Sequence, residues 1–384
     1  MAVDLLKTLI SFDTSSPEGK QYRELVNFLK EWLEERGVST KVVEVDDAYR
    51  MKVCPWSPRP ILLAWVGEGE PLLEFNGHYD VVPPGDGWTV DPFEGKVEGD
   101  KLYGRGATDM KGGVAAIALA LAKLAQKGWK GPKVQAAFVP DEEIGGQCGT
   151  GYRVAFLKED FPIGKHVVIA EPSGGSVWIG HKGAVWFDVT VHGEQAHAST
   201  PWLGDNAFVK ASSLALYLQN ELTNRFSKRV SKYDYTSGHP MARMNTVTIG
   251  GIAYSTSNKT NTIPGTFKFT IDIRVIPEER AEDVAKEVYE LLPDYTKAKV
   301  TELMEPYITE NSVIAKVIEE RWGYPPKVCE GGLDLRYYRG YDAVAWGPGE
   351  LHLAHKPDEW VRISQVEEFA EMYSQLPALL EKVT

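Results

Sequence analysis

Apolar residues along the chain follow two patterns, one typical of buried strands and one typical of helices. Continuous apolar runs predict strands at 61–66, 71–77, 134–140 and 166–171. Residues 3–37 are predicted to be largely helical, with a break at 15–19, and residues 114–127 form a helix rich in small residues. Strands and helices that alternate in this way predict an α/β fold, with a mostly parallel sheet flanked by helices.

A different pattern begins at about residue 181. Alternating apolar residues predict a half-buried strand from Ala184 to His192. The segments that follow are predicted as a helix at Ala207–Leu222, strands at Asn245–Gly250 and Thr266–Val275, a helix at Pro277–Leu292 and a strand at Lys297–Leu303. This order is that of the ferredoxin-like α+β motif. The linking segments 224–244 and 253–264 are rich in Gly, Ser, Asn and Pro, which predicts loops.

The last part of the chain returns to the first pattern. It predicts a helix at 311–322, a strand at 342–347 and a final helix at 364–382. We therefore predict that a small domain, residues 181–304, is inserted between the two parts of a larger domain, residues 1–180 and 305–384. A length of 384 residues agrees with two domains.

Composition excludes several classes of protein. A hydrophobic fraction of 43% with 25% charged residues is typical of a soluble globular protein, and no apolar run approaches the roughly 20 residues of a membrane span. A net charge of -12 without a run of Lys and Arg argues against a nucleic-acid partner. Asp4 and the lack of an early apolar block argue against a signal peptide. The three distant cysteines, Cys54, Cys148 and Cys329, predict a reducing, cytoplasmic location without a disulfide framework.

His78 and Asp80 follow the predicted strand at 71–77, and Asp109 precedes the helix at 114–127. Residues two apart on a strand share a face, so His78 and Asp80 point the same way. A carboxylate beside a histidine is typical of a metal ligand whose second ring nitrogen is held in place. A capped helix next to a chance His-x-Asp pair would give the same local sequence, so this segment alone does not decide between the two.

Three more groups stand at or after the ends of predicted strands. Glu142 and Glu143 follow the strand at 134–140, Glu171 ends the next strand, and His355 lies in a loop after a late strand. Taken singly, they read as a solvated acidic turn, a loop acid and a surface histidine. Ligands of open α/β sheets bind beyond the carboxyl ends of the strands, so their joint occurrence favours one shared site.

The candidate ligands combine imidazole nitrogen with carboxylate oxygen. This set suits zinc, and cobalt or manganese are possible substitutes. Five candidates exceed the three protein ligands that a single catalytic zinc commonly takes. Two metals that share one bridging carboxylate, at a separation of roughly 3.5–4 Å, fit the number better.

Three segments of the sequence resemble those of a known family. The segments His78-Tyr79-Asp80-Val81-Val82-Pro83, Leu102-Tyr103-Gly104-Arg105-Gly106 and Asp109-Met110-Lys111-Gly112 are similar to those of the co-catalytic zinc metallopeptidases. That family includes succinyl-diaminopimelate desuccinylase, acetylornithine deacetylase, aminoacylase and the glutamate carboxypeptidases. The resemblance extends over essentially the whole chain.

The resemblance implies a role for each candidate. One metal would be bound by His78, Asp109 and Glu171, and the other by Asp109, Glu143 and His355. Asp109 would bridge and would be followed by a cis peptide bond, while Asp80 would support His78. Glu142 would be the general base. Adjacent glutamates cannot both aim at one point, so one can bind metal while the other moves protons.

Residues of the inserted domain also match the family. The resemblance implies that His197 reaches the active site of a second subunit in a homodimer, where it stabilises the oxyanion. Asn261 and Arg274 resemble the region that binds the substrate carboxylate. A polar loop, a turn asparagine and a structural salt bridge are the alternative explanations for these residues.

Arg336 and Gly332 are further substrate-binding candidates. They belong to Gly331-Gly332-Leu333-Asp334-Leu335-Arg336, where the family usually has Thr in place of Leu333. This departure removes a hydroxyl and leaves the exact substrate open.

The predicted activity is hydrolysis of an amide that carries a free carboxylate. Its substrate would be an N-acyl amino acid, cleaved by a deacylase, desuccinylase or deacetylase, or a short peptide. A carboxypeptidase or dipeptidase of the same family is the alternative within the enzymes. A metal-binding protein without turnover is disfavoured by the intact Glu142, and an unrelated α/β aminopeptidase by the inserted domain.

Overall fold

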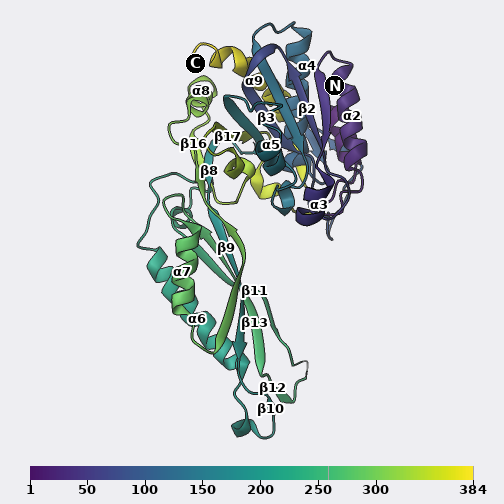
Figure 1. Cartoon of the computed structure of the whole chain (residues 1–384). Coiled ribbons are helices and arrows are strands. Elements are labelled where there is room, and N and C mark those ends of the chain that lie inside the picture. The colour runs from purple at the N-terminus through teal and green to yellow at the C-terminus, as the bar shows by residue number, and fades with distance from the viewer. Residues whose placement is uncertain (258, 384) are drawn as a thin grey trace. The chain divides into compact units, whose positions relative to one another are not determined.

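The computed structural model describes residues 1–257 and 259–383. The chain forms two compact units, whose elements are labelled in Figure 1. The first unit comprises Met1–Ile179, Thr309–Pro326 and Leu333–Thr384, and the second unit comprises Gly180–Ile308 and Lys327–Gly332. The second unit therefore draws on two separate stretches of the chain.

The first unit is built on a sheet with the strand order β1-β2-β6-β3-β7-β17-β8. In chain order these strands are β1 (Ser39–Glu44), β2 (Pro60–Val66), β3 (Glu68–His78), β6 (Pro132–Val139), β7 (His166–Pro172), β8 (Val177–His181) and β17 (Asp342–Gly347). The central pairs β6-β3, β3-β7 and β7-β17 are parallel, and the outer pairs are antiparallel. Every residue of β7 is buried, as expected for a strand covered on both faces.

Helices cover this sheet (Figure 1). They are α1 (Ala2–Ser11), α2 (Tyr22–Glu34), α3 (Asp47–Val53), α4 (Gly112–Gln126), α5 (Thr150–Phe156), α8 (Val313–Trp322) and α9 (Ile363–Leu380). Small residues let α4 approach the sheet closely, because a Cβ at Gly113 would lie 2.2 Å from the carbonyl oxygen of Ala170. A separate three-stranded sheet joins β4 (Lys96–Glu98), β5 (Lys101–Tyr103) and β18 (Trp360–Arg362). The prediction of a mostly parallel α/β sheet flanked by helices is confirmed.

The second unit has the strand order β11-β13-β9-β14, and each neighbouring pair is antiparallel. Its main elements are β9 (Gly183–His192), α6 (Ala207–Phe226), β11 (Thr246–Ser255), β13 (Thr266–Val275), α7 (Ala281–Leu291) and β14 (Thr296–Met304). This is the ferredoxin-like order, and the predicted α+β class of this part is confirmed. Both helices pack on the face that carries Phe187 and Ile271.

Short elements complete both units. They are η1 (Ala107–Lys111), η2 (Glu142–Ile144), β10 (Ala196–His197), η3 (Pro201–Leu203), η4 (Pro240–Arg243), β12 (Thr262–Ile263), β15 (Tyr307–Ile308), β16 (Pro326–Cys329), η5 (Asp334–Tyr338) and η6 (Leu351–Leu353). Residues 327–332 join the second unit through backbone hydrogen bonds, since Val328 donates to Asp234 O at 2.8 Å and accepts from Thr236 N at 3.1 Å.

Two predicted elements differ from the observed ones. The helix expected from Pro277 begins at Ala281, because Glu279 N donates to Ile276 O in a preceding turn. The loop expected at 253–264 starts later, since β11 continues past a bulge between Ile249 and Ala253. Residue 258 of that loop lies outside the described residues.

The cysteines were predicted to lie in a reducing compartment without a disulfide framework, but the structure contains a disulfide. Cys54 and Cys148 form one across a sequence separation of 94 residues, while Cys329 is free and buried. The wide spacing hid the pair, because the fold brings both cysteines into one buried cluster with Ile61 and Ala137. The cysteine count therefore no longer supports a reducing compartment.

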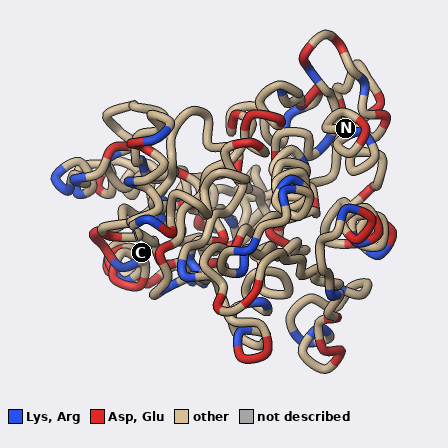
Figure 2. Tube along the Cα trace, turned by 90° about the horizontal axis from the view of Figure 1, so that it is seen from above, with Lys and Arg blue, Asp and Glu red and all other residues tan. Residues whose placement is uncertain are grey.

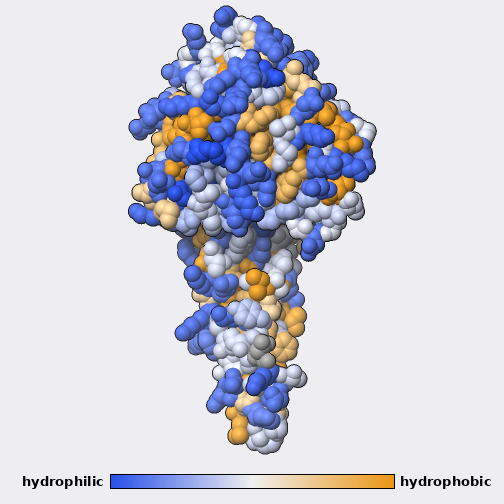
Figure 3. Space-filling model, turned by 90° about the vertical axis from the view of Figure 1, so that its right-hand side faces the viewer, coloured by the Kyte–Doolittle hydropathy of each residue, from blue (hydrophilic) through white to orange (hydrophobic). Residues whose placement is uncertain are grey.

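Charge and apolar residues are both distributed over the molecule. Lys and Arg are interspersed with Asp and Glu over the trace (Figure 2). On the face shown in Figure 3, apolar patches are interspersed with hydrophilic residues. Within the described residues, no helix combines the length and the apolar character needed to cross a membrane.

Candidate metal centre

His78 is the last residue of β3 and is 1% exposed. Its Nδ1 lies 3.0 Å from the backbone oxygen of Asp80 and 3.4 Å from the Asp80 carboxylate. Its Nε2 lies 3.2 Å from Oδ1 of Asp109 and 3.8 Å from Oε1 of Glu171. An Nδ1 proton donated to Asp80 leaves the Nε2 lone pair directed at two carboxylates, which is the arrangement of a supported metal ligand.

Asp109 lies between two histidines. Its Oδ1 faces His78, and its Oδ2 lies 3.3 Å from Nε2 of His355. The residue sits in the irregular turn η1, where its φ and ψ of -123° and 95° are not helical. The Asp109–Met110 peptide bond is cis, as the resemblance implied. Each carboxylate oxygen of Asp109 thus faces a different candidate ligand, the geometry of a bridging carboxylate.

Glu143 and His355 complete a second group. Oε2 of Glu143 lies 3.1 Å from Nε2 of His355, which follows η6 and has a left-handed φ of 62°. Ligand atoms lie within 4.8 Å of one another in both groups, and we name these by their burial. The buried triad is His78, Asp109 and Glu171, and the exposed triad is Asp109, Glu143 and His355.

Asp80 also holds the turn that carries the two glutamates. The backbone N–H groups of Glu142 and Glu143 donate to Oδ1 and Oδ2 of Asp80, at 3.1 and 3.2 Å. One carboxylate therefore fixes both the His78 ring and the start of η2. Glu142 belongs to neither triad, which leaves its carboxylate outside both ligand groups.

Burial and neighbouring negative charges raise the pKa of three glutamates around the centre. Burial, together with the charges of Asp334 and Glu171, raises the pKa of Glu142 well above its ordinary value. Burial and the charge of Asp109 raise the pKa of Glu143, and raise that of Glu171 to about 8. Buried acids that oppose one another's ionisation in this way need a compensating positive charge.

The pKa values of the two histidines are also raised, but by hydrogen bonds to carboxylates rather than by burial. Burial alone would lower the pKa of His78, but hydrogen bonds to Asp109 and Asp80 raise it well above its ordinary value. Hydrogen bonds to Asp109 and Glu143 raise the pKa of His355 to about 10. Burial would raise the pKa of Asp109, yet hydrogen bonds with His355 and His78 hold it below its usual range.

Two buried oxygen atoms indicate that the two triads fit metal ions. Oε1 of Glu143 and Oε1 of Glu171 are buried and have no hydrogen-bond partner among the described residues. A buried carboxylate oxygen without a partner costs free energy unless a cation coordinates it. Together with imidazole nitrogen from two histidines, these donors fit divalent metals that accept mixed nitrogen and oxygen ligands.

Glu359 is a structural residue that sequence reasoning did not single out. Its Oε1 accepts from the backbone N–H of Thr108 at 2.9 Å and of Asp109 at 3.0 Å, and its Oε2 accepts from Gly106 N and from Arg105. Burial and the charge of Asp109 raise the pKa of Glu359 to about 7. The available signal was an acid four residues after His355 in the same short loop.

A buried ion pair supports the residue before Glu142. Asp141 has a left-handed φ of 65° and accepts from Arg59 Nε at 2.6 Å and from the Tyr22 hydroxyl at 3.0 Å. Beyond η2, a Cβ at Gly146 would lie 2.3 Å from Oδ1 of Asp334, so glycine is required there. The turn with the two glutamates is therefore fixed at both ends.

Arg336 lies in the first unit, in η5. Its guanidinium donates to the backbone oxygen of Gly145 at 2.7 Å and of Leu333 at 3.1 Å, and lies 3.8 Å from the Asp334 carboxylate. These contacts tie Arg336 to the loop that follows Glu143. Gly332 ends the short segment assigned to the second unit, and a Cβ there would meet the side chain of Met304.

His197, Asn261 and Arg274 all lie in the second unit. The structure brings the first two together, because β10 pairs with β12 and Ala198 N donates to Asn261 O at 2.9 Å. His197 is exposed, and its Nδ1 lies 2.7 Å from Ser199 Oγ. Arg274 binds Asp272 through two nitrogens, at 2.9 and 3.0 Å. The guanidinium fork is thus already matched by a carboxylate of the same strand.

A model of the peptidase family M20/M25/M40 matches residues 75–378. A succinyl-diaminopimelate desuccinylase of Gluconobacter oxydans is 31% identical, with 82% of this chain and 83% of that protein aligned.

Solved structures with lower identity share the fold. An M20 family metallo-carboxypeptidase from Sulfolobus solfataricus superposes with a TM-score of 0.74 at 19% identity, covering 99% of both chains. Human carnosine dipeptidase 1 gives a TM-score of 0.70 at 18% identity, covering 99% of this chain and 97% of that chain.

Proposed function

This chain belongs to the peptidase family M20/M25/M40, and from that premise we propose that it hydrolyses the amide bond of an N-acyl amino acid. Membership confirms the resemblance seen in the sequence, and the chain is a metal-dependent amidohydrolase. The observation that carries the proposal is Glu142, a free carboxylate beside two ligand triads that share Asp109.

The proposed cofactors are two zinc ions, for which cobalt or manganese can substitute. The buried triad of His78, Asp109 and Glu171 would hold one ion, and the exposed triad would hold the other. When bound, such metals polarise the amide carbonyl and lower the pKa of water. The ligand assignment rests on donor chemistry and proximity, and Asp109 is the bridging candidate because its two oxygens face different histidines.

Glu142 is the proposed general base. It takes a proton from the attacking water and then gives it to the leaving nitrogen, so one residue acts first as base and then as acid. Asp80 supports this role by holding the backbone N–H groups of Glu142 and Glu143. Glu142 is half-buried, and its raised pKa suits a group that must hold a proton between the two steps.

The second unit is proposed to act as a lid and as the contact between two subunits. In this scheme His197 of one subunit stabilises the oxyanion at the centre of the other. Asn261 and Arg274 would bind the substrate carboxylate, with Arg336 and Gly332 as further contacts. The Asp272 carboxylate already matches the Arg274 fork, so the substrate carboxylate would have to replace it or share it.

The choice among acyl groups rests on relatives. The 31% identical protein is a succinyl-diaminopimelate desuccinylase, which favours a dicarboxylic acyl group. A carboxypeptidase or dipeptidase activity is the second candidate, supported by the two solved structures with the same fold. Leu333 offers no hydroxyl to the substrate, unlike the Thr that is usual in the family. A cytoplasmic location remains a prediction.

A substrate panel tests the proposal. The metal-loaded protein is assayed with N-succinyl and N-acetyl amino acids and with dipeptides, in zinc, cobalt or manganese. We expect turnover of N-acyl amino acids and a fall of about 10²–10⁴ in Glu142→Gln, which keeps the ligands. Turnover of dipeptides alone would favour the second candidate. Near-normal turnover in Glu142→Gln would mean that another group carries the proton.

A mixing experiment tests the shared site. Glu142→Gln and His197→Ala chains are each expected to be inactive, for different reasons. A mixed dimer contains one centre with an intact Glu142 and a His197 from the other chain. Recovery of activity on mixing supports the two-subunit site. No recovery, or full activity in a monomer, would contradict the role of His197 in a second subunit.

A further inference from the structure

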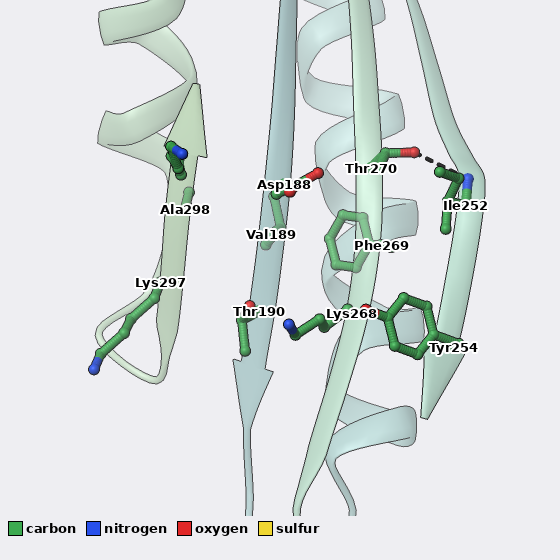
Figure 4. Close-up of a pocket in the computed structure, with 11 residues that line it drawn as sticks. Asp188, Val189, Thr190, Ile252, Tyr254, Lys268, Phe269, Thr270, Lys297 and Ala298 are labelled. Carbon is green, nitrogen blue, oxygen red and sulfur yellow. Dashed lines mark hydrogen bonds between the residues drawn. The ribbon is translucent and has the colours of Figure 1, made fainter. Parts of the chain in front are cut away.

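A hollow lies on the face of the second unit's sheet opposite α6 and α7 (Figure 4). Its volume is about 360 Å³, and it is lined by residues of all four strands: Asp188, Val189, Thr190, Ile252, Tyr254, Lys268, Phe269, Thr270, Lys297, Ala298 and Lys299. This volume falls within the roughly 300–1,000 Å³ of ordinary small-molecule sites. The hollow lies within the second unit and includes none of the residues proposed for the metal centre.

Strand register explains why the sheet is hollowed here. One row across the sheet runs Tyr254, Lys268, Thr190, Lys297, and the residues of this row are direct cross-strand partners. Thr190 is short and stands between the long side chains of Lys268 and Lys297. The surface is therefore low above Thr190 and higher on both sides of it. Lys268 and Lys297 lie on the two strands that flank Thr190, so their backbones are roughly 10 Å apart, and their long side chains can both reach a ligand above Thr190.

The next row has short side chains on both central strands. Thr270 pairs with Asp188, which pairs with Lys299, and the Thr270 hydroxyl accepts from Ile252 N at 3.0 Å (Figure 4). Threonine and aspartate form the low floor, with Ile252 and Lys299 at the outer strands. The two rows together make a shallow basin with one cationic side and one apolar side.

Charge in the basin is unbalanced. Lys268, Lys297 and Lys299 are exposed, and among the described residues none of the three forms an ion pair or a side-chain hydrogen bond. Among the described residues that line the basin, Asp188 is the one carboxylate. Three ammonium groups and one carboxylate leave a local excess of positive charge in a protein whose net charge is -12. Such a local reversal of sign attracts anions.

The opposite side of the basin is apolar. Ile252 is 62% exposed and Tyr254 is 48% exposed, and both belong to the edge strand β11. In Figure 4 the Lys268 ammonium extends toward Thr190, while the Tyr254 ring lies on the other side of Lys268. A ligand that bridges the two sides needs an anionic group at one end and an apolar body at the other.

We propose that this basin is a second, non-catalytic site that binds a small carboxylate with an apolar or aromatic body. The carboxylate would lie over Lys268 and Lys297, within reach of the Thr190 hydroxyl, and the body would lie over Ile252 and Tyr254. A singly charged carboxylate fits better than a doubly charged phosphate, because Asp188 in the neighbouring row repels the second charge. This site does not depend on the proposed reaction.

Binding of 4-phenylbutyrate to the metal-loaded full chain tests the proposal, because this probe has a carboxylate, an aromatic body and no amide bond. Calorimetry compares it with acetate, which lacks the body, and with 4-phenyl-1-butanol, which lacks the charge. We expect the wild-type protein to bind 4-phenylbutyrate more tightly than either. No saturable binding, or equal affinity for the alcohol, would overturn the site.

Matched variants locate the binding. Lys268→Gln with Lys297→Gln should raise the Kd for 4-phenylbutyrate about tenfold or more, the effect of losing one strong polar contact. Lys228→Gln with Lys286→Gln changes the charge equally in the same unit outside the basin and should leave the Kd within about twofold. Equal effects of the two pairs would show non-specific charge attraction and would overturn the proposal.

Two further experiments test the apolar side of the basin and whether the basin is open to solvent. Tyr254→Ala should weaken the probe severalfold, whereas Tyr217→Ala on α6 should not. Analytical ultracentrifugation of the two double-lysine variants shows whether a second copy of the chain covers this face. A change of association state confined to the Lys268 and Lys297 pair would assign the basin to a subunit contact and overturn the small-molecule site.

Discussion

The buried triad and the exposed triad share Asp109 but are built from different parts of the fold. His78 and Glu171 stand at the ends of the paired parallel strands β3 and β7, and are 1% and 3% exposed. His355 comes from a loop, and its side chain is 53% exposed. Strand ends place ligands through a hydrogen-bonded ladder, whereas a loop ligand depends on side-chain contacts.

Support for the two histidines differs in the same way. Nδ1 of His78 contacts Asp80, whereas no described residue hydrogen-bonds Nδ1 of His355. Partners of this kind fix a ligand ring and commonly change metal affinity 10–100-fold. We therefore expect the exposed triad to hold its metal more weakly and to exchange it faster.

Removal of the shared ligand should have the largest effect. Asp109→Ala takes one donor from each triad, so both metal positions should empty and activity should fall below detection. Metal per chain is measured by elemental analysis after gel filtration. Retention of two tightly bound equivalents would show that Asp109 does not bridge.

Loss of one histidine should separate the two triads. His355→Ala is expected to lose one metal equivalent and to keep the one in the buried triad, while His78→Ala should lose the more tightly held metal. Titration with a competing chelator gives both affinities. Loss of the same metal ion in both variants would contradict the assignment of one ion to each triad.

Glu359 should link the two triads, because it lies in the His355 loop and holds the backbone of Asp109. Glu359→Gln replaces an acceptor by an amide that can present N–H to the N–H groups of Thr108 and Asp109. We expect a 10–100-fold loss in metal affinity or kcat, as for other residues that orient ligands. Glu367→Gln, on α9, is the matched control and should behave as wild type. Equal behaviour of the two variants would remove Glu359 from this role.

The disulfide should give the smallest effect on the centre. It joins the end of α3 to Cys148 in the loop beyond η2, so it restrains the segment that follows Glu143. Cys54→Ser with Cys148→Ser should lower the free energy of unfolding by about 2–5 kcal/mol, measured in urea. Metal affinity of the buried triad should stay unchanged. A selective loss there would contradict the separation between the triads.

Sequence patterns predicted the parts of the site that follow apolar strands. His78, Glu143 and Glu171 each lie at or just after a buried run, so the carboxyl edge of the sheet brings them together. Assignment of separate roles to Glu142 and Glu143 came from the family resemblance, because adjacent acids look alike in one sequence.

Short strands and long-range contacts could not be predicted from local sequence patterns. The strands β4 and β5 are three residues each, too short for a period-2 pattern. Glu359 acts through backbone N–H groups some 250 positions away, and nothing in its own segment signals that contact. The disulfide was missed for the same reason, since the cysteines meet only in the folded chain.

The composite make-up of the second unit limits how this protein can be recombined. Residues 327–332 return to it after the chain has left, and Ser237 N donates to Glu330 Oε1 at 2.9 Å. A fragment cut at 180 and 308 would lack Val328, and the backbone groups of Asp234 and Thr236 would lose their hydrogen bonds to it. An exchange of the second unit between relatives must therefore transfer both residues 180–308 and residues 327–332. A single recombination crossover on each side would give a chimaera with an incomplete edge.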